Sequence, residues 1–292
     1  MSRNLQKEVT DRILAKLRAG VAPWRQNWSA KASGAMPRNA ISKRGYSGVN
    51  VPLLWMAQQD SGFTSPSWLT FKQALEAGGN VRKGEKGTGI VFVGMIEKDA
   101  SESRSGEAER VSFLKSFTVF NVAQCDGLPA DIAAPPAETV NPNTRDACAE
   151  EFLRSTRADI RHGEGCAYYR RAADFIMLPD FGTFNSSDGY YGAAFHELAH
   201  WTGAEHRLNR TKGKRFGDQE YTFEELVAEL TAAFLSAEFG FSNEDSAASY
   251  LAGWIKFMEN HETAFMSAAS EASKAHAYMR ELALAETMPL AA

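Results

Sequence analysis

The chain has 292 residues, of which 44% are hydrophobic and 23% are charged, and its net charge is −4. This composition excludes disordered, collagen-like and disulfide-scaffold proteins, and it fits one large or two medium-sized globular domains. The charge is unevenly distributed, because residues 1–127 carry a net charge of +7 and residues 128–292 a net charge of −11. A basic front half and an acidic back half suggest two domains with different partners.

No apolar run approaches the roughly 18 residues that a membrane-spanning helix needs. The first residues are charged and lack the apolar core of a signal peptide. We therefore expect a cytoplasmic protein that does not bind membranes.

The first predicted elements belong to a small mixed α/β domain over residues 1–127. Apolar side chains recur every four residues from Leu5 to Leu17, ahead of Gly20, which predicts an amphipathic helix that ends at the glycine. A loop-rich stretch over residues 23–51 follows this helix.

A second helix and a hairpin complete the predicted first domain. Thr70 is the expected N-cap of a helix that closes at Gly78. The β-rich runs 89–96 and 111–122 predict two strands, and the polar segment 97–110 between them predicts a long hairpin loop.

Residues 128–143 contain four prolines, and we interpret them as the linker between the domains. After the linker, residues 144–292 predict a mainly helical domain, so the chain as a whole belongs to the α+β class. The expected elements of this second domain are a helix over 145–156, short strands within 168–178, and helices over about 193–202, 223–239 and 246–284.

The most specific motif is HELAH, His196 to His200, an HExxH sequence. Residues four apart on a helix face the same way, so His196 and His200 can bind one metal ion. Glu197 lies one step round the helix and can take a proton from water, as a hydrolytic zinc site requires. The motif predicts a zinc-dependent metallopeptidase, although two imidazoles and a carboxylate also bind Mn²⁺.

A catalytic zinc site needs a third protein ligand, and the segment FEELVAELTAAFL offers Glu224, Glu225 and Glu229. Glu225 and Glu229 share one helical face, so one can bind metal while the other orients a ligating imidazole. Ala228, Ala232 and Ala233 make the helix thin around Glu229, which favours Glu229 as the ligand. The alternative is Glu225, because zincins with a Glu-xxx-Asp pattern use the first acid. The donor that stabilises the oxyanion stays open among four residues: Tyr190, Tyr191, His206 and Tyr221.

Basic and aromatic residues are interleaved in the first 90 residues. Bases of single-stranded nucleic acid stack on exposed aromatic rings for about 1–3 kcal/mol each, while Lys and Arg follow the phosphates. Glycines in the segments 43–48 and 81–89 permit close approach of the backbone to a phosphate. This chemistry predicts single-stranded DNA binding, with candidate contacts at Trp24, Arg25, Trp28, Lys43, Arg44, Tyr46, Arg82, Lys83 and Lys86.

Three segments occur in order along the chain: SWLTFKQALEAGGNVRKGEKGTGIVF, YYGAAFHELAHWTGAEHRLNR and YTFEELVAELTAAFL. They resemble the ArdC-like antirestriction proteins of conjugative plasmids, and the resemblance extends over essentially the whole chain. It implies an N-terminal domain that binds single-stranded DNA, also found beside plasmid primases, and a C-terminal zincin-like metallopeptidase domain. It further implies protection of incoming plasmid DNA from restriction enzymes, Glu197 as catalytic acid/base, and metal ligands at His196, His200 and Glu229.

Two other functions fit the same residues. The chain would then be a cytosolic metalloprotease whose basic domain docks a protein substrate, or a DNA-binding protein whose zincin site is not needed for its role. No motif specifies the peptide or protein that the peptidase would cleave.

Overall fold

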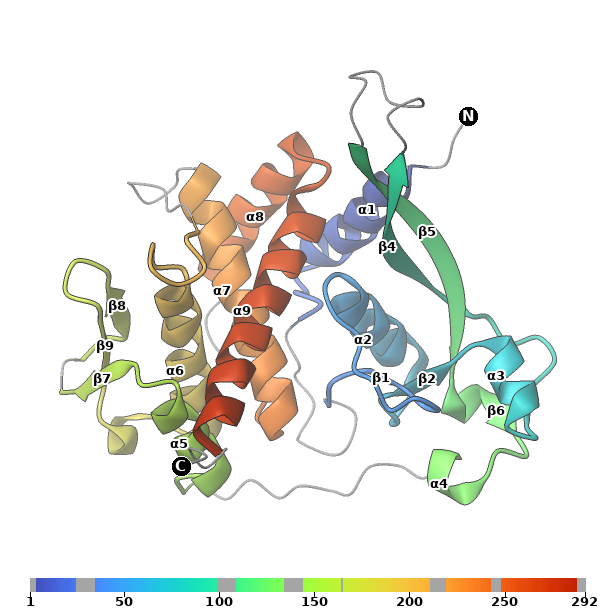
Figure 1. Ribbon diagram of the computed structural model, residues 1–292, viewed down its shortest axis with the longest axis horizontal. Helices are drawn as coiled ribbons and strands as arrows, with labels where there is room; N and C mark the ends of the chain where they lie inside the picture. Colours follow the sequence, from blue (N-terminus) through green and yellow to red (C-terminus); the bar gives the residue numbers. More distant parts are fainter. Residues whose placement is uncertain are drawn as a thin grey trace.

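The computed structural model describes residues 4–24, 35–98, 109–133, 144–163, 165–210, 219–242 and 248–287. Its elements form two lobes that lie side by side (Figure 1). One lobe holds the N-terminal elements and a long twisted hairpin, and the other is a helical bundle with a small sheet along its outer side. The predicted α+β class, with a mixed first half and a mainly helical second half, is confirmed. Among the described residues, no helix combines the length and the apolar character that a membrane span requires.

Two helices build the first lobe. The predicted amphipathic helix is α1 (Leu5–Arg18), which begins where the side chain of Asn4 accepts a hydrogen bond from the Lys7 amide. The second helix, α2 (Asn50–Ser61), is not among the predicted elements. Its apolar residues cover most of its circumference, so the sequence shows no amphipathic period there. It ends at Gly62, whose left-handed backbone has a φ of 68°.

The main sheet of this lobe has four strands in the order β1-β2-β5-β4, with bounds β1 (Arg38–Asn39), β2 (Ser67–Leu69), β5 (Glu109–Asn121) and β4 (Thr88–Lys98). Strands β4 and β5 pair antiparallel, which confirms the predicted hairpin; most of its predicted loop lies outside the described residues. Strand β4 is at the sheet edge. There the Asn50 side chain both donates to and accepts from the backbone of Val91, at 2.8 Å each, as a neighbouring strand would.

Short elements complete the first lobe: α3 (Phe71–Glu76), β3 (Asn80–Val81), the 3₁₀ turn η1 (Val122–Gln124), β6 (Cys125–Asp126) and α4 (Ala130–Ala133). Thr70 starts α3 with a capping box, as predicted. Helix α4 falls inside the predicted linker 128–143. Leu128 and Ile132 pack against a small core cluster of the first lobe, so this part of the segment is structured, and residues 134–143 lie outside the described residues.

The second lobe contains the following elements: α5 (Ala147–Ser155), β7 (Asp159–His162), β8 (Tyr168–Arg170), β9 (Phe175–Leu178), the 3₁₀ turn η2 (Phe181–Thr183), α6 (Ser187–Thr202), α7 (Gln219–Phe239), α8 (Ala248–Asn260) and α9 (Ala264–Thr287). Helix α6 starts earlier than the predicted residue 193, because Ser186 caps it through the Gly189 amide. The single helix predicted over 246–284 is wrong, since the chain turns at residues 261–263 and forms two helices.

The two lobes share one hydrophobic core. Its buried members come from α1, α2 and β4 on one side and from α7, α8 and α9 on the other. Trp24 lies at the junction, with its ring centroid 5.4 Å from that of Trp254 and 5.5 Å from that of Phe265. A second hydrophobic cluster lies within the second lobe, where residues of α6 pack against α5, β9, α7 and α9. The domain limits 1–127, 128–143 and 144–292 stay predictions. The first and last of these segments both contribute residues to the shared core.

The position of Trp24 corrects one expectation of the sequence analysis. Its side chain is 0% exposed, so the ring has no surface on which a DNA base could stack. Trp55 and Trp68 are equally buried. The tryptophans described in the basic half therefore stabilise the core, and the prediction of Trp24 as a DNA contact is wrong.

We expect the substitution Trp24→Ala to lower the free energy of unfolding by about 3–5 kcal/mol, because it leaves a cavity in the shared core. Urea denaturation followed by circular dichroism measures this change. The control Leu75→Ala alters a side chain that is 52% exposed and should change the free energy by no more than about 0.5 kcal/mol. Equal effects of the two substitutions would contradict the shared core.

Candidate metal centre

Helices α6 and α7 pack against each other (Figure 1), and together they carry all the candidate metal ligands. His196 and His200 are one turn apart on α6, and their ring centroids are 4.8 Å apart. The acidic candidates come from the facing helix α7. The HExxH segment is thus helical, as predicted, and both of its imidazoles face the helix that carries the candidate third ligand.

Glu225 lies between the two imidazoles. One carboxylate oxygen is 3.5 Å from Nε2 of His196, and the other is 3.4 Å from Nε2 of His200. One ligand atom from each of the three residues lies within 4.8 Å of the others. Two imidazole nitrogens and one carboxylate oxygen are the protein ligands of a catalytic zincin site.

Glu229 occupies a different place from the one that the sequence favours. Its carboxylate lies 3.7 Å from Nδ1 of His196, on the side of the ring away from Glu225. Two of the alanines that favoured Glu229 as ligand pack in the hydrophobic clusters. Ala233 belongs to the shared core and Ala232 to the second cluster. The geometry therefore favours Glu225 over Glu229 as the third ligand. This agrees with the alternative interpretation of the sequence, in which the first acid of the pair binds the metal.

His200 also has a carboxylate beside its Nδ1 atom. Glu224 lies 3.3 Å from that atom and is itself held by Arg210, which donates to both carboxylate oxygens at 3.0 Å. Arg210 donates further to the hydroxyl of Thr202 and to the backbone carbonyl of Ala199. Both imidazoles thus turn Nε2 towards Glu225 and have a carboxylate next to Nδ1. Such partners orient a ligating imidazole and raise its basicity.

The sequence alone does not identify Arg210 as part of this site, because no spacing rule links it to the HExxH helix. It follows that helix by a short turn, and tertiary packing brings it back against the start of α7. A lone arginine in the segment AEHRLNR carries no signal of burial. Glu224 is among the three acidic residues that the sequence offers on this helix, but its contact with His200 depends on the packing of the two helices.

The centre holds more negative than positive charge. Burial by itself would lower the pKa of His196, but a hydrogen bond with Glu225 and the charges of Glu229 and Glu197 raise it to about 9. Burial would raise the pKa of Glu225, yet hydrogen bonds with both histidines hold it well below its usual range. The same carboxylates that favour a proton on His196 also favour a metal cation between the imidazoles and Glu225.

Glu224 is ionised for a related reason. Burial opposes its charge, but hydrogen bonds with His200 and Arg210 lower its pKa to about 2. The buried Arg210–Glu224 ion pair thus holds a charged carboxylate next to Nδ1 of His200. A divalent cation beside Glu225 would offset the remaining carboxylate charge, so the residues present fit such an ion.

The remaining catalytic candidates differ in their burial and in their position in the fold. Glu197 is nearly buried on α6, next to His196. Tyr190 and Tyr191 are core residues, and His206 is exposed beside Asp174. Tyr221 is half-buried at the start of α7. Of the four candidate oxyanion donors, it is the one whose position is neither in the core nor beside Asp174.

The predicted DNA contacts that the structure describes lie on the other lobe, and most of them are exposed. Lys43 and Arg44 are exposed on a turn after β1, and Tyr46 is half-buried against the core. In the loop before β4, Lys83 and Lys86 are exposed, while Arg82 donates to Glu85 and to the carbonyl of Ala123 and so holds the loop together. Two predicted contacts lie outside the described residues: Arg25 and Trp28.

Comparison with known families assigns each half of the chain. A family model described as the N-terminal domain of anti-restriction factor ArdC matches residues 3–120, and a model of zincin-like metallopeptidases matches residues 147–271. The fold and the centre define a protein in which a zincin-like metallopeptidase domain follows an ArdC-type N-terminal domain.

Solved structures and curated sequences extend this match over nearly the whole chain. The metal-free crystal structure of antirestriction protein ArdC from plasmid R388 is 38% identical, covers 97% of this chain and 99% of its own, and superposes with a TM-score of 0.83. The Mn(II)-bound structure of that protein is 36% identical, with coverages of 96% and 98% and a TM-score of 0.79. The chain belongs to the ArdC family of antirestriction proteins.

Two further relatives come from other bacterial sources. Protein y4eC of Sinorhizobium fredii is 35% identical over 280 residues, which are 93% of this chain and 90% of that protein. DNA primase TraC of Escherichia coli is 38% identical over 291 residues, which are 92% of this chain and 26% of the primase. The chain thus corresponds to about a quarter of that larger protein.

We expect Arg210→Met to lower the free energy of unfolding of the metal-free protein by about 3–5 kcal/mol, because it leaves the Glu224 carboxylate buried without its cation. Urea denaturation in the presence of a chelator measures the loss. The control is Arg18→Met, which removes an exposed ion pair with Glu259 and should cost about 1 kcal/mol or less. A loss at Arg210 as small as that at Arg18 would contradict the anchoring role.

Proposed function

We propose that the chain is an antirestriction protein that binds single-stranded DNA, protects incoming plasmid DNA from restriction, and carries a divalent-metal peptidase centre. The observation that carries this proposal is the convergence of His196, His200 and Glu225 within a chain that matches ArdC from end to end. The restriction enzymes it would counter act on DNA in the cytoplasm, so we expect the chain to act there.

For the metal centre, we propose His196, His200 and Glu225 as the ligands. A metal bound there would polarise a carbonyl group and lower the pKa of a water molecule. Zinc suits two imidazoles and a carboxylate well, and manganese accepts the same kinds of donor. The R388 ArdC protein has been crystallised in a Mn(II)-bound form, which supports a divalent ion in this chain. Glu229 and Glu224 would hold the imidazole rings from their Nδ1 sides.

Glu197 is the general acid/base in this proposal. Its carboxylate would accept a proton from the attacking water and then give that proton to the leaving amine. Glu197 lies on the same helix as both histidines, so the packing of α6 against α7 fixes its place relative to the ligands. This role of Glu197 does not depend on which peptide is cleaved.

Single-stranded DNA binding is proposed for the first lobe. Residues 1–127 carry a net charge of +7, and basic side chains lie exposed on its loops. Similarity to ArdC and to part of a DNA primase supports a DNA partner. The two other functions, a protease that docks a protein and a DNA-binding protein independent of its metal centre, are distinguished by the experiments below.

We expect Glu225→Ala to lose most of its bound metal and Glu229→Ala to keep a site weakened by about 10–100-fold. The reason is that Glu225 supplies a ligand atom, whereas Glu229 orients one. Metal content after dialysis and competition with a zinc chelator measure both variants. The reverse ranking would return Glu229 to the role that the sequence favoured.

We expect Glu197→Gln to keep its metal and its affinity for single-stranded DNA but to hydrolyse peptides about 10²–10⁴-fold more slowly, because the general base is gone. Metal analysis, oligonucleotide binding and a peptide library digested by the wild-type protein measure these properties. Peptide hydrolysis that survives the substitution would contradict the role of Glu197.

The same variant tests the biological role when a conjugative plasmid that encodes it enters a restricting host. Protection that survives in Glu197→Gln would show that DNA binding suffices, and loss of protection would show that peptidase chemistry is required. Absence of single-strand binding by the wild-type protein at low salt would favour the protein-docking protease.

A further inference from the structure

The β4–β5 hairpin presents an aromatic face that neither the core nor the metal centre uses. Residues paired across antiparallel strands point to the same face of the sheet. The register therefore places three phenylalanines and one lysine on one face, through the pairs Ile90–Phe117, Phe92–Lys115 and Gly94–Phe113. The ring centroid of Phe92 lies 6.3 Å from that of Phe113 and 6.1 Å from that of Phe117, so the rings form a continuous row.

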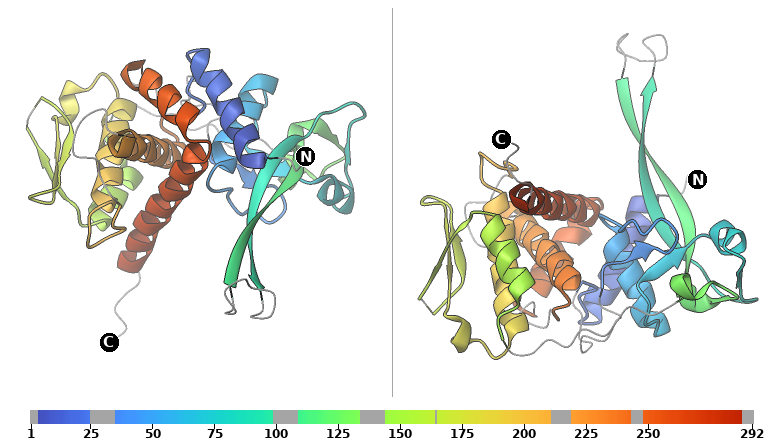
Figure 2. Two further views of the ribbon diagram at one scale, coloured as in Figure 1. Left: turned by 90° about the horizontal axis from the view of Figure 1, so that it is seen from above. Right: turned by 60° about the horizontal axis from the view of Figure 1, so that its bottom comes forward.

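This row is open to solvent. The side chain of Phe92 is 51% exposed and that of Phe117 is 47% exposed, and Phe113 is half-buried. The hairpin extends away from the body of the molecule (Figure 2). Adjacent exposed aromatic side chains of this kind mark interaction sites in soluble proteins.

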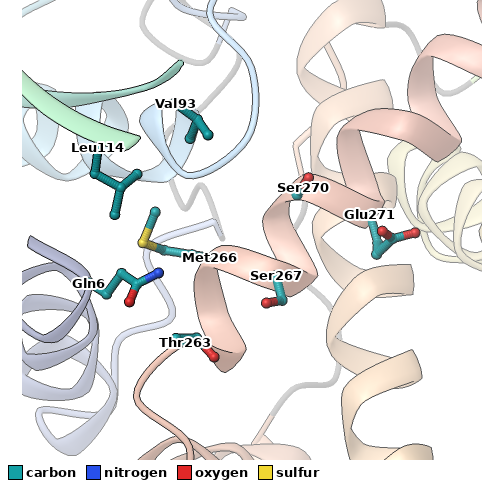
Figure 3. Close-up of a pocket in the computed structure, with 8 residues that line it drawn as sticks. All are labelled: Gln6, Val93, Leu114, Thr263, Met266, Ser267, Ser270 and Glu271. Atoms are coloured by element: carbon teal, nitrogen blue, oxygen red, sulfur yellow. The ribbon is translucent and has the colours of Figure 1, made fainter. Parts of the chain in front are cut away.

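The opposite face of the hairpin is turned towards the body. Val91 is buried in the shared core, and Leu114 packs against that core. Val93 and Leu114 face Met266 of α9 across a pocket of about 450 Å³ (Figure 3). The core thus covers one face of the hairpin and, on the other face, only its base at Ile90 and Val119. It leaves the three phenylalanines for another partner.

The aromatic face is held in a defined shape. The ring of Phe113 lies over Gly94, so closely that a Cβ atom at Gly94 would meet the ring at 2.2 Å. At the base of the hairpin, Ile90 and Val119 pack against Leu54 of α2. A surface that is ordered before binding loses less conformational entropy when a ligand docks.

The charge of this face suits a polyanion. Lys115 stands in the row, with its ammonium nitrogen 5.1 Å from the Phe113 ring centroid. It is the one charged residue within Thr88–Met95 and Phe113–Val119, so these parts of the strands carry no carboxylate. The exposed Lys83 and Lys86 lie in the loop that leads into β4. Aromatic rings combined with lysines are the usual binding surface for single-stranded nucleic acid.

We propose that the face formed by Phe92, Phe113, Lys115 and Phe117 is the platform on which bases of single-stranded DNA stack. The inference rests on the proposed DNA-binding function and locates it. Bases stack on the rings, Lys115 meets a phosphate, and Lys83 and Lys86 continue the phosphate path towards the base of the hairpin. The aromatic candidates predicted from the sequence lie earlier in the chain, at Trp24, Trp28 and Tyr46.

The test measures the affinity of the full chain for a fluorescein-labelled oligothymidylate by anisotropy across a salt series. The double variant Phe92→Ala/Phe117→Ala should bind at least about tenfold more weakly at every salt concentration, with an unchanged salt slope, because stacking is lost and phosphate contacts are kept. Lys115→Ala should reduce the slope of log K against log salt by about one.

The matched control is Met95→Ala, which shortens a side chain that is 72% exposed on the opposite face of the same hairpin and should leave affinity unchanged. Circular dichroism and metal content establish that each variant is folded. As an independent readout, Phe117→Trp should show fluorescence quenching on addition of the oligonucleotide, and Met95→Trp should not.

Binding by Phe92→Ala/Phe117→Ala within twofold of the wild type would overturn the platform, as would an equal loss in Met95→Ala. Failure of the wild-type protein itself to bind at about 50 mM salt would instead overturn the proposed DNA-binding function, so the two failures are distinguishable.

Discussion

The contact between the Glu225 carboxylate and the Nε2 atoms of both histidines is the constraint on which the metal centre depends. It requires α6 and α7 to pack closely, and it turns the Nδ1 atoms of the rings towards Glu229 and Glu224. Glu224 is charged in turn because the buried Arg210 donates to both of its oxygens. Each of these contacts places a carboxylate in a poorly solvated position, and a cation bound at the centre would offset the accumulated negative charge.

The shared core explains how the two halves of the chain are connected. Trp24 packs between Trp254 and Phe265, and residues of α1 and α2 meet α7, α8 and α9 in one cluster. Helix α7 thus contributes both to this core and to the metal centre. A change in the first lobe that disturbed the core would reach α7 directly, so the proposed DNA-binding surface and the candidate metal centre belong to one folded unit.

The aromatic residues of the first half divide by environment. The described tryptophans are inside, where large rings fill the core and are not accessible to bases. Phe92, Phe113 and Phe117 are outside because they lie beyond the base of the hairpin, where residues of the same face enter a core cluster, while the other face contacts the shared core. Aromatic enrichment in a basic segment predicts a DNA-binding surface in the first half, whereas burial and strand register decide which of the rings are accessible.

The sequence by itself determined the two-part organisation, the HExxH helix, the amphipathic helix α1 and the β4–β5 hairpin, because each depends on local periodicity or on residues adjacent along one element. It reduced the third ligand to Glu225 or Glu229, which share a helical face. Only the tertiary structure gives a reason to propose Glu225 over Glu229, since the distances to the imidazoles depend on how deeply and at what rotation α7 packs against α6. Tertiary packing likewise decided the anchoring role of Arg210, the burial of Trp24 and the break between α8 and α9, because these result from contacts between residues distant in sequence.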